Sequence, residues 1–335
     1  MRIMVFDVPA ESGGALTILK QYYDRAINDK DNQWLFVIST PYLNETENVK
    51  VLRYPWIKKS WFHRLYFDKF KAGKIVKKYN VDEVLSLQNV IIQKCKVKQI
   101  LYLHQPLPFV EKKYKLTENL KFWVYQNLIS RMIYKSIKKA DRVIVQTRWM
   151  KEACLRNVNT ENNKFKVEHP KINIEVKNKY TEEIDKNKLF FYPSSALSYK
   201  NHKVIIEAAI ELKKQNILDY RVVFTLNGNE NKDIKQLYRI AKLNNLPIDF
   251  IGKIGIEKVY DYYSKSILIF PSYIETFGLP MLEAKLYECP IIASDCAFSH
   301  EILDGYEKAC FFDAVDFYAL SKKMKSIIEN NLVET

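Results

Sequence analysis

Residues 267–284 read ILIFPSYIETFGLPMLEA: four apolar residues, a short loop and the start of a helix. Gly278 permits close backbone approach, and Pro280 suits the first helical turn. The free amide groups and the dipole at the start of this helix favour an anion such as a diphosphate. Glu275 precedes the helix, and Glu283 lies about one turn inside it, where a carboxylate can accept hydrogen bonds from a ribose diol. Either glutamate alone would be read as an ordinary surface acid, but the whole stretch predicts a diphosphate site.

Strands and helices alternate outward from this stretch along the whole chain. Strands are expected at 2–7, 34–39, 49–54, 84–87, 100–104, 142–147, 189–193, 222–226, 248–252, 267–270, 291–293 and 310–312, and helices at 15–28, 61–78, 118–139, 202–215, 233–244, 257–264, 279–287 and 317–329. Short apolar strands alternating with helices indicate parallel sheets covered on both faces. We therefore predict two doubly wound α/β domains, 1–172 and 173–335, with a ligand in the cleft between them and the last helix free to pack back towards the first domain.

Composition excludes several classes of protein. The chain has 335 residues, 47% of them hydrophobic, which excludes disorder and leaves enough for two cores. No apolar run approaches the roughly 20 residues of a membrane span, and the first residues do not resemble an export signal. The five scattered cysteines predict neither disulfides nor a metal site, so we expect a reducing, cytoplasmic compartment.

The charge is unevenly divided. Residues 1–170 hold 31 Lys and Arg against 16 Asp and Glu, a net +15, whereas residues 171–335 hold 22 against 23, a net −1. Such a basic half indicates a polyanionic partner, either a nucleic acid or an anionic membrane surface. The segment 56–71 interleaves aromatic and basic residues, as interfacial segments do, and its Arg64 is expected among the lipid contacts. An ordinary packed helix with a basic face would also fit this pattern.

Two glutamates seven residues apart around Phe-Gly-Leu-Pro resemble the signature of the family-four glycosyltransferases, retaining, metal-independent enzymes of the GT-B fold that use nucleotide sugars. The resemblance covers the second half of the chain and, more loosely, the first. It implies that Glu275 contacts the donor sugar and that Glu283 binds the ribose. It also implies that the amides of Phe277, Gly278 and Leu279 hold the sugar and the diphosphate.

Two lysines of the second half of the chain are candidates for contacts with the diphosphate. Lys200 stands at a helix start after a strand, where its charge can neutralise a phosphate, as it does in the family. The family usually has an arginine five residues earlier, where this chain has Ser195, so Lys253 is a candidate for the missing charge.

Two further features belong to the first half of the chain. The pair Gly13-Gly14 after the first strand lies where the family brings backbone close to donor phosphate and acceptor. His104, at the end of a strand, would by itself be read as a structural histidine, but in the family it contacts the donor sugar.

The resemblance implies that the protein is a retaining glycosyltransferase that needs no cofactor or metal. A UDP or GDP sugar would be the donor, and a lipid-linked saccharide of a bacterial surface polysaccharide would be the acceptor. We expect it at the inner face of the cell membrane, bound through its basic half. A nucleotide-sugar epimerase, a phosphorylase or a non-catalytic nucleotide-sugar-binding protein of the same fold remains an alternative. A nucleic-acid-binding protein is a further alternative, although no recognisable module supports it.

Overall fold

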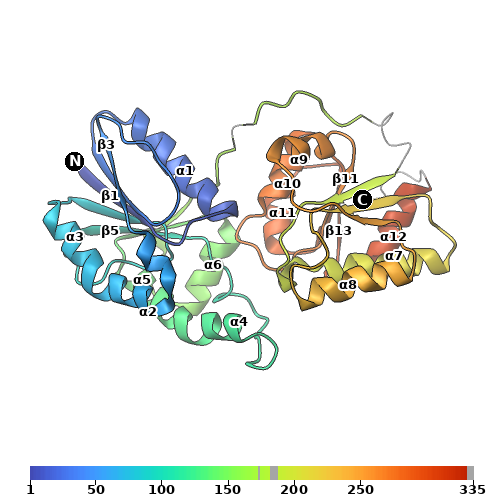
Figure 1. The fold of residues 1–335 in the computed structure, drawn as a ribbon, viewed down its shortest axis with the longest axis horizontal. Coiled ribbons are helices and arrows are strands. Elements are labelled where there is room, and N and C mark those ends of the chain that lie inside the picture. The colour runs from blue at the N-terminus through green and yellow to red at the C-terminus, as the bar shows by residue number, and fades with distance from the viewer. Residues whose placement is uncertain (173, 182–187, 330–335) are drawn as a thin grey trace. The chain divides into compact units, whose positions relative to one another are not determined.

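The computed structural model describes residues 1–172, 174–181 and 188–329. The chain divides into two compact units, Met1–Lys171 and Ile172–Thr335. Each unit is a parallel sheet with helices packed on it (Figure 1). No helix within the described ranges is both long and apolar enough to cross a membrane.

The sheet of the first unit has the strand order β3-β2-β1-β4-β5-β6-β7, and all neighbouring strands are parallel. The strands are β1 (Arg2–Asp7), β2 (Gln33–Ile38), β3 (Val49–Arg53), β4 (Glu83–Ser86), β5 (Lys98–Leu103), β6 (Arg142–Val145) and β7 (Phe165–Val167). The helices are α1 (Gly13–Asn28), η1 (Pro55–Lys59), α2 (Trp61–Tyr66), η2 (Phe67–Lys71), α3 (Ala72–Lys78), α4 (Leu120–Val124), η3 (Tyr125–Ile129), α5 (Ser130–Lys139), α6 (Arg148–Asn157) and η4 (Asn162–Lys164).

Both faces of this sheet are buried, as strand β1 shows. Ile3 and Val5 belong to the core cluster on the α1 face, whereas Met4 and Phe6 belong to a second cluster that includes Ile75 of α3. Continuous apolar strands are what a parallel sheet with two covered faces requires. Chain order reverses between β1 and β4, so the carboxyl ends of these two strands form the topological switch point, where ligands of such folds bind.

The second unit repeats this plan with the strand order β10-β9-β8-β11-β12-β13, again parallel throughout. The strands are β8 (Leu189–Tyr192), β9 (Arg221–Phe224), β10 (Ile248–Phe250), β11 (Ile267–Phe270), β12 (Ile291–Ser294) and β13 (Ala309–Phe312). The helices are η6 (Ser198–Lys200), α7 (His202–Lys214), α8 (Lys232–Leu243), α9 (Ile256–Tyr263), α10 (Leu279–Leu286), α11 (Ala297–Leu303) and α12 (Phe317–Ile328). The switch point lies between β8 and β11, and α12 packs against α7 of its own unit.

Candidate functional site

The loop between β11 and α10 has, at Gly278, a backbone conformation that favours glycine. Gly278 immediately precedes α10 with φ +94° and ψ 57°, in the left-handed region. A Cβ atom there would lie 2.6 Å from Cε of Met281. Pro280 is the second residue of α10 and has no amide proton to leave unpaired. The chain therefore turns sharply from the strand into a helix whose first amide, that of Leu279, has no partner inside the helix, whereas the Met281 amide donates to the Gly278 carbonyl at 3.0 Å.

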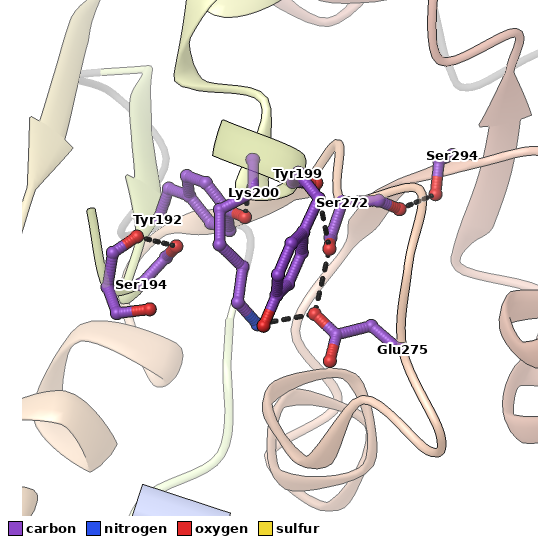
Figure 2. Close-up of polar contacts among 8 residues, drawn as sticks. Tyr192, Ser194, Tyr199, Lys200, Ser272, Glu275 and Ser294 are labelled. Atoms are coloured by element: carbon purple, nitrogen blue, oxygen red, sulfur yellow. Dashed lines mark hydrogen bonds and ion pairs between the residues drawn. The ribbon is translucent and has the colours of Figure 1, made fainter. Parts of the chain in front are cut away.

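Glu275 and Lys200 form an ion pair at the carboxyl edge of the second sheet (Figure 2). Their side chains are only 15% and 16% exposed, respectively, so water screens the pair less than it screens a surface pair. The hydroxyl of Ser272 donates to the same Glu275 oxygen at 2.8 Å. Lys200 Nζ also lies 5.9 Å from the centre of the Phe270 ring. The structure thus brings together two residues that are 75 positions apart in the sequence.

Backbone contacts hold the two loops that carry this pair. The side chain of Asn201, in the left-handed conformation with φ 58°, donates to the carbonyl oxygens of Pro271 at 3.2 Å and Ala314 at 2.7 Å. The hydroxyl of Tyr192 donates to the Lys200 carbonyl at 2.7 Å, and the amide of Tyr273 donates to the Tyr199 carbonyl at 3.2 Å. The loops after β8 and β11 are therefore fixed to each other on both sides of the switch point.

Buried serines add a second layer beneath the ion pair. The Ser294 hydroxyl donates to the Ser272 carbonyl at 2.5 Å, and both side chains are fully buried (Figure 2). Ser272 therefore links β12, its own loop and Glu275. Ser272, Ser294 and Asn201 were not predicted from the sequence. The available signal was position: Ser272 lies two residues after β11 and Ser294 is the last residue of β12, at the edge of the sheet where ligands of such folds bind.

Glu283 lies on α10 in a different environment. The Tyr263 hydroxyl donates to its Oε2 atom at 3.1 Å, and burial raises the pKa of Glu283 while that hydrogen bond lowers it. No hydrogen bond or ion pair between described residues joins Glu283 to Glu275 or Lys200. The two glutamates flank the start of α10 and are held by different partners.

The remaining second-unit candidates have less support from their surroundings. The side chain of Phe277 is buried and that of Leu279 is half-buried, so any role in binding falls to their amides at the start of α10. Lys253 is exposed after β10, and its side chain makes no hydrogen bond or ion pair with any residue that the structure describes. Ser195, at the position of the family's arginine, is exposed in the loop before η6.

The candidates of the first unit lie at the carboxyl edge of its own sheet. Gly13 and Gly14 are exposed at the start of α1, and Gly13 has φ +59°. His104 follows β5, where its backbone amide donates to Oδ1 of Asn89 at 2.8 Å and its ring meets Tyr102 edge-on at 5.9 Å. Burial lowers the pKa of His104 to about 4, so its imidazole is neutral at physiological pH. A neutral imidazole can still donate one hydrogen bond and accept another.

No group of three or more His, Cys, Asp or Glu side chains is placed to hold a metal ion in the parts of the chain described above. A lysine, a helix start and neighbouring hydroxyl groups can instead meet an anionic ligand. Acidic groups next to the lysine can meet sugar hydroxyls. The arrangement is thus suited to a ligand that joins a diphosphate to a sugar.

Comparison with known proteins gives the fold independently. HepE from Anabaena, solved in complex with UDP-glucose, superposes with a TM-score of 0.72 at 14% identity, over 98% of this chain and 90% of that one. Sucrose-phosphate synthase from Thermosynechococcus elongatus gives a TM-score of 0.74 at 16% identity, over 98% and 90%. The fold is GT-B. The predicted pair of Rossmann-like, doubly wound α/β domains is confirmed.

Sequence comparison points the same way. Residues 173–335 match the family model of glycosyl transferases group 1. The O-antigen chain mannosyltransferase RfbU of Salmonella typhimurium (strain LT2) is 21% identical over 222 residues, which are 64% of this chain and 61% of that protein. The matched part thus spans less than two thirds of this curated relative. The family match covers the unit that carries Lys200, Glu275 and Glu283.

Proposed function

We propose that the protein is a retaining, metal-independent glycosyltransferase that moves a sugar from a nucleotide-diphosphate sugar to a glycan acceptor. One observation carries the proposal: the Lys200–Glu275 ion pair lies beside the start of α10, in the region that matches glycosyl transferases group 1. The second unit would hold a UDP or GDP sugar and the first would hold the acceptor. The name of the O-antigen relative supports a role in a bacterial surface polysaccharide. We propose a lipid-linked saccharide as the acceptor.

The chain's own residues suit the steps of this reaction. Lys200 and the first amides of α10 would hold the diphosphate and stabilise the charge that grows on it as the glycosidic bond breaks. Glu275 would bind hydroxyl groups of the donor sugar, and Glu283 those of the ribose. His104, neutral at physiological pH, would donate to or accept from a sugar hydroxyl. In a reaction with retention, the departing diphosphate can take the acceptor proton on the same face, so positioning of both substrates is the protein's main task.

Binding of the nucleotide tests this function most directly. Calorimetry with UDP, GDP and their sugars should show one preferred nucleotide. Lys200→Ala should weaken its binding about tenfold to a hundredfold, because a charged hydrogen bond contributes about 1.5–3 kcal/mol. Lys203→Ala is the matched control, because Lys203 is 71% exposed and pairs only with Glu207 on its own helix. Equal losses in both variants, or no nucleotide binding at all, would contradict the proposal.

We also propose that the basic first unit attaches the protein to the inner face of an anionic membrane. Large apolar side chains are exposed along α2 and η2, with Trp61 at 58% and Phe62 at 83%. Lys59, Lys69 and Lys71 are exposed in the same segment. Anionic lipid attracts such lysines by about 1 kcal/mol each.

Arg64 differs from the other basic residues expected to contact lipid in segment 56–71. Arg64 is half-buried and pairs with Asp68, so it is not one of the lipid-facing cations.

A further inference from the structure

A second polar cluster lies at the switch point of the first unit, and no step above uses it. Arg64 of α2 donates through Nε to Asp68 Oδ2 at 2.7 Å, and these side chains are 23% and 16% exposed. The Arg64 charge also acts on the carboxyl group of Asp7, the last residue of β1, and on the Tyr125 hydroxyl. Gln105, just after β5, lies near Tyr125 and lowers the pKa of its hydroxyl. We call Asp7, Arg64, Asp68, Gln105 and Tyr125 the Arg64 cluster.

Several polar atoms of this cluster have no partner. Both carboxyl oxygens of Asp7 and Oδ1 of Asp68 are buried without a hydrogen bond, and Asp7 is fully buried. The Ala10 amide lies near Asp7 and lowers its pKa. No described residue accepts a hydrogen bond from the two terminal nitrogens of Arg64. Unpaired buried polar groups are costly, and natural proteins keep them mainly where a ligand or water completes them.

The backbone around the cluster is also unusual. Asp68 lies in η2 and Tyr125 in η3, and both segments are single π-helical turns inside longer helices. Such turns are rare and occur frequently at functional sites, because the extra residue redirects side chains. The two turns come from helices more than 50 residues apart, yet both carry a member of the same cluster.

The balance of charge indicates which ligand fits. Arg64 is neutralised by Asp68, and the adjacent Lys58 pairs with Glu11 at 3.2 Å. Burial raises the pKa of Asp7 well above its usual value, against the opposing effects of the Ala10 amide, Arg64 and Lys58. Both cations are paired with a carboxylate, so a phosphate would find no excess of positive charge here. Many donors and acceptors with no net charge suit the hydroxyl groups of a neutral sugar.

We propose that the Arg64 cluster binds the hydroxyl groups of an uncharged sugar unit of the acceptor. Arg64 contacts the sugar through its terminal nitrogens. Asp68 is a positioning residue that holds the guanidinium through Nε, and the polar groups of Asp7, Tyr125 and Gln105 complete the site. The inference rests on the proposed function, because it assigns residues to the acceptor side of that reaction.

The test uses the intact protein in the presence of its preferred nucleotide. The probes are the octyl glycosides of glucose, galactose, mannose, rhamnose and N-acetylglucosamine, titrated to millimolar concentration by saturation-transfer NMR. Glucose 1-phosphate and inorganic phosphate form a second arm. At least one neutral glycoside should bind, and Arg64→Gln should weaken it tenfold or more. Arg131→Gln, an exposed arginine on α5, should leave its affinity unchanged.

Conservative variants separate positioning from folding. Asp7→Asn should keep glycoside affinity, because the amide keeps the shape of the carboxyl group and one acceptor oxygen. Arg64→Lys keeps the charge and the fold but loses the planar fork, so it should bind as weakly as Arg64→Gln. Thermal unfolding of each variant monitors the fold.

Three results would overturn the inference: no neutral glycoside binds, Arg64→Gln binds as the unsubstituted protein does, or only the phosphorylated probes bind. Nucleotide affinity, measured by calorimetry on the same samples, separates this inference from the proposed function. If the unsubstituted protein binds its nucleotide but none of the neutral glycosides, only the assignment of the Arg64 cluster is contradicted. Nucleotide binding absent from the unsubstituted protein contradicts the proposed function itself.

Discussion

His104 provides a test at the scale of a single residue. Burial lowers its pKa from 6.5 to about 4, so the unfolded chain binds more protons than the folded one between these pH values. The free energy of unfolding should therefore rise with pH from about 4 to 6.5 and level off above it. His104 should raise the free energy of unfolding by at most about 3 kcal/mol between acid pH and pH 7. His104→Gln should remove this rise.

Denaturant unfolding at a series of pH values measures this effect. The pKa of His202, which burial lowers to about 3, contributes to both proteins and cancels in the difference. Parallel curves for the two proteins would show that His104 is solvated in the folded chain.

Other single residues show which features of the site could be predicted from the sequence and which could not. The position of Gly278 before a helix was predictable, because a strand, a glycine and a proline follow one another closely. The ion pair between Lys200 and Glu275 was not predicted as a contact, since nothing local relates two residues 75 positions apart. Only the strand order, which places β8 beside β11, brings them together.

At the scale of elements, Gly278 should be the most sensitive position of the α10 loop. Gly278→Ala places a Cβ at φ +94°, which costs about 1–2 kcal/mol in the left-handed region. Gly14→Ala, in helix α1, is the matched control. A Cβ atom at Gly14 would meet no other atom within 4 Å, and alanine stabilises a helix relative to glycine. Chemical denaturation should show a loss of stability for the first variant and none for the second. A loss of the same size in both would mean that backbone strain at Gly278 is not the cause.

Helices and strands were predicted correctly where the spacing of apolar residues and the residues at the two ends indicated the same element. The prediction failed where these two signals did not agree. The second-half strands were found because each is a short apolar run bounded by polar residues. The expected helices 61–78 and 118–139 are each interrupted by a π turn, which no side-chain period signals. Strand β7 and helices α6 and α11 were missed. Strand β7 is only three residues long, and half-buried edge strands carry a weak pattern.

At the scale of the whole molecule, the uneven charge predicts which surface meets anionic lipid. The protein should sediment with anionic vesicles at low salt and not with neutral ones. The binding should weaken as salt is added, since salt screens charges beyond about 8 Å at physiological ionic strength. Replacing Lys59, Lys69 and Lys71 of the first unit with Glu should remove most of this binding. The same change at Lys232, Lys235 and Lys242, all exposed on or beside α8, should not. Salt-sensitive binding to RNA without binding to vesicles would favour the nucleic-acid alternative.

The ion pair of Lys200 with Glu275 also has a consequence for product release under the proposed function. An incoming diphosphate would have to displace a carboxylate that is tethered within reach and therefore present at a very high effective concentration. After transfer of the sugar, Glu275 would compete with the nucleoside diphosphate for Lys200. We therefore expect product inhibition to be weaker, and affinity for the free nucleotide lower, than if Lys200 were unpaired.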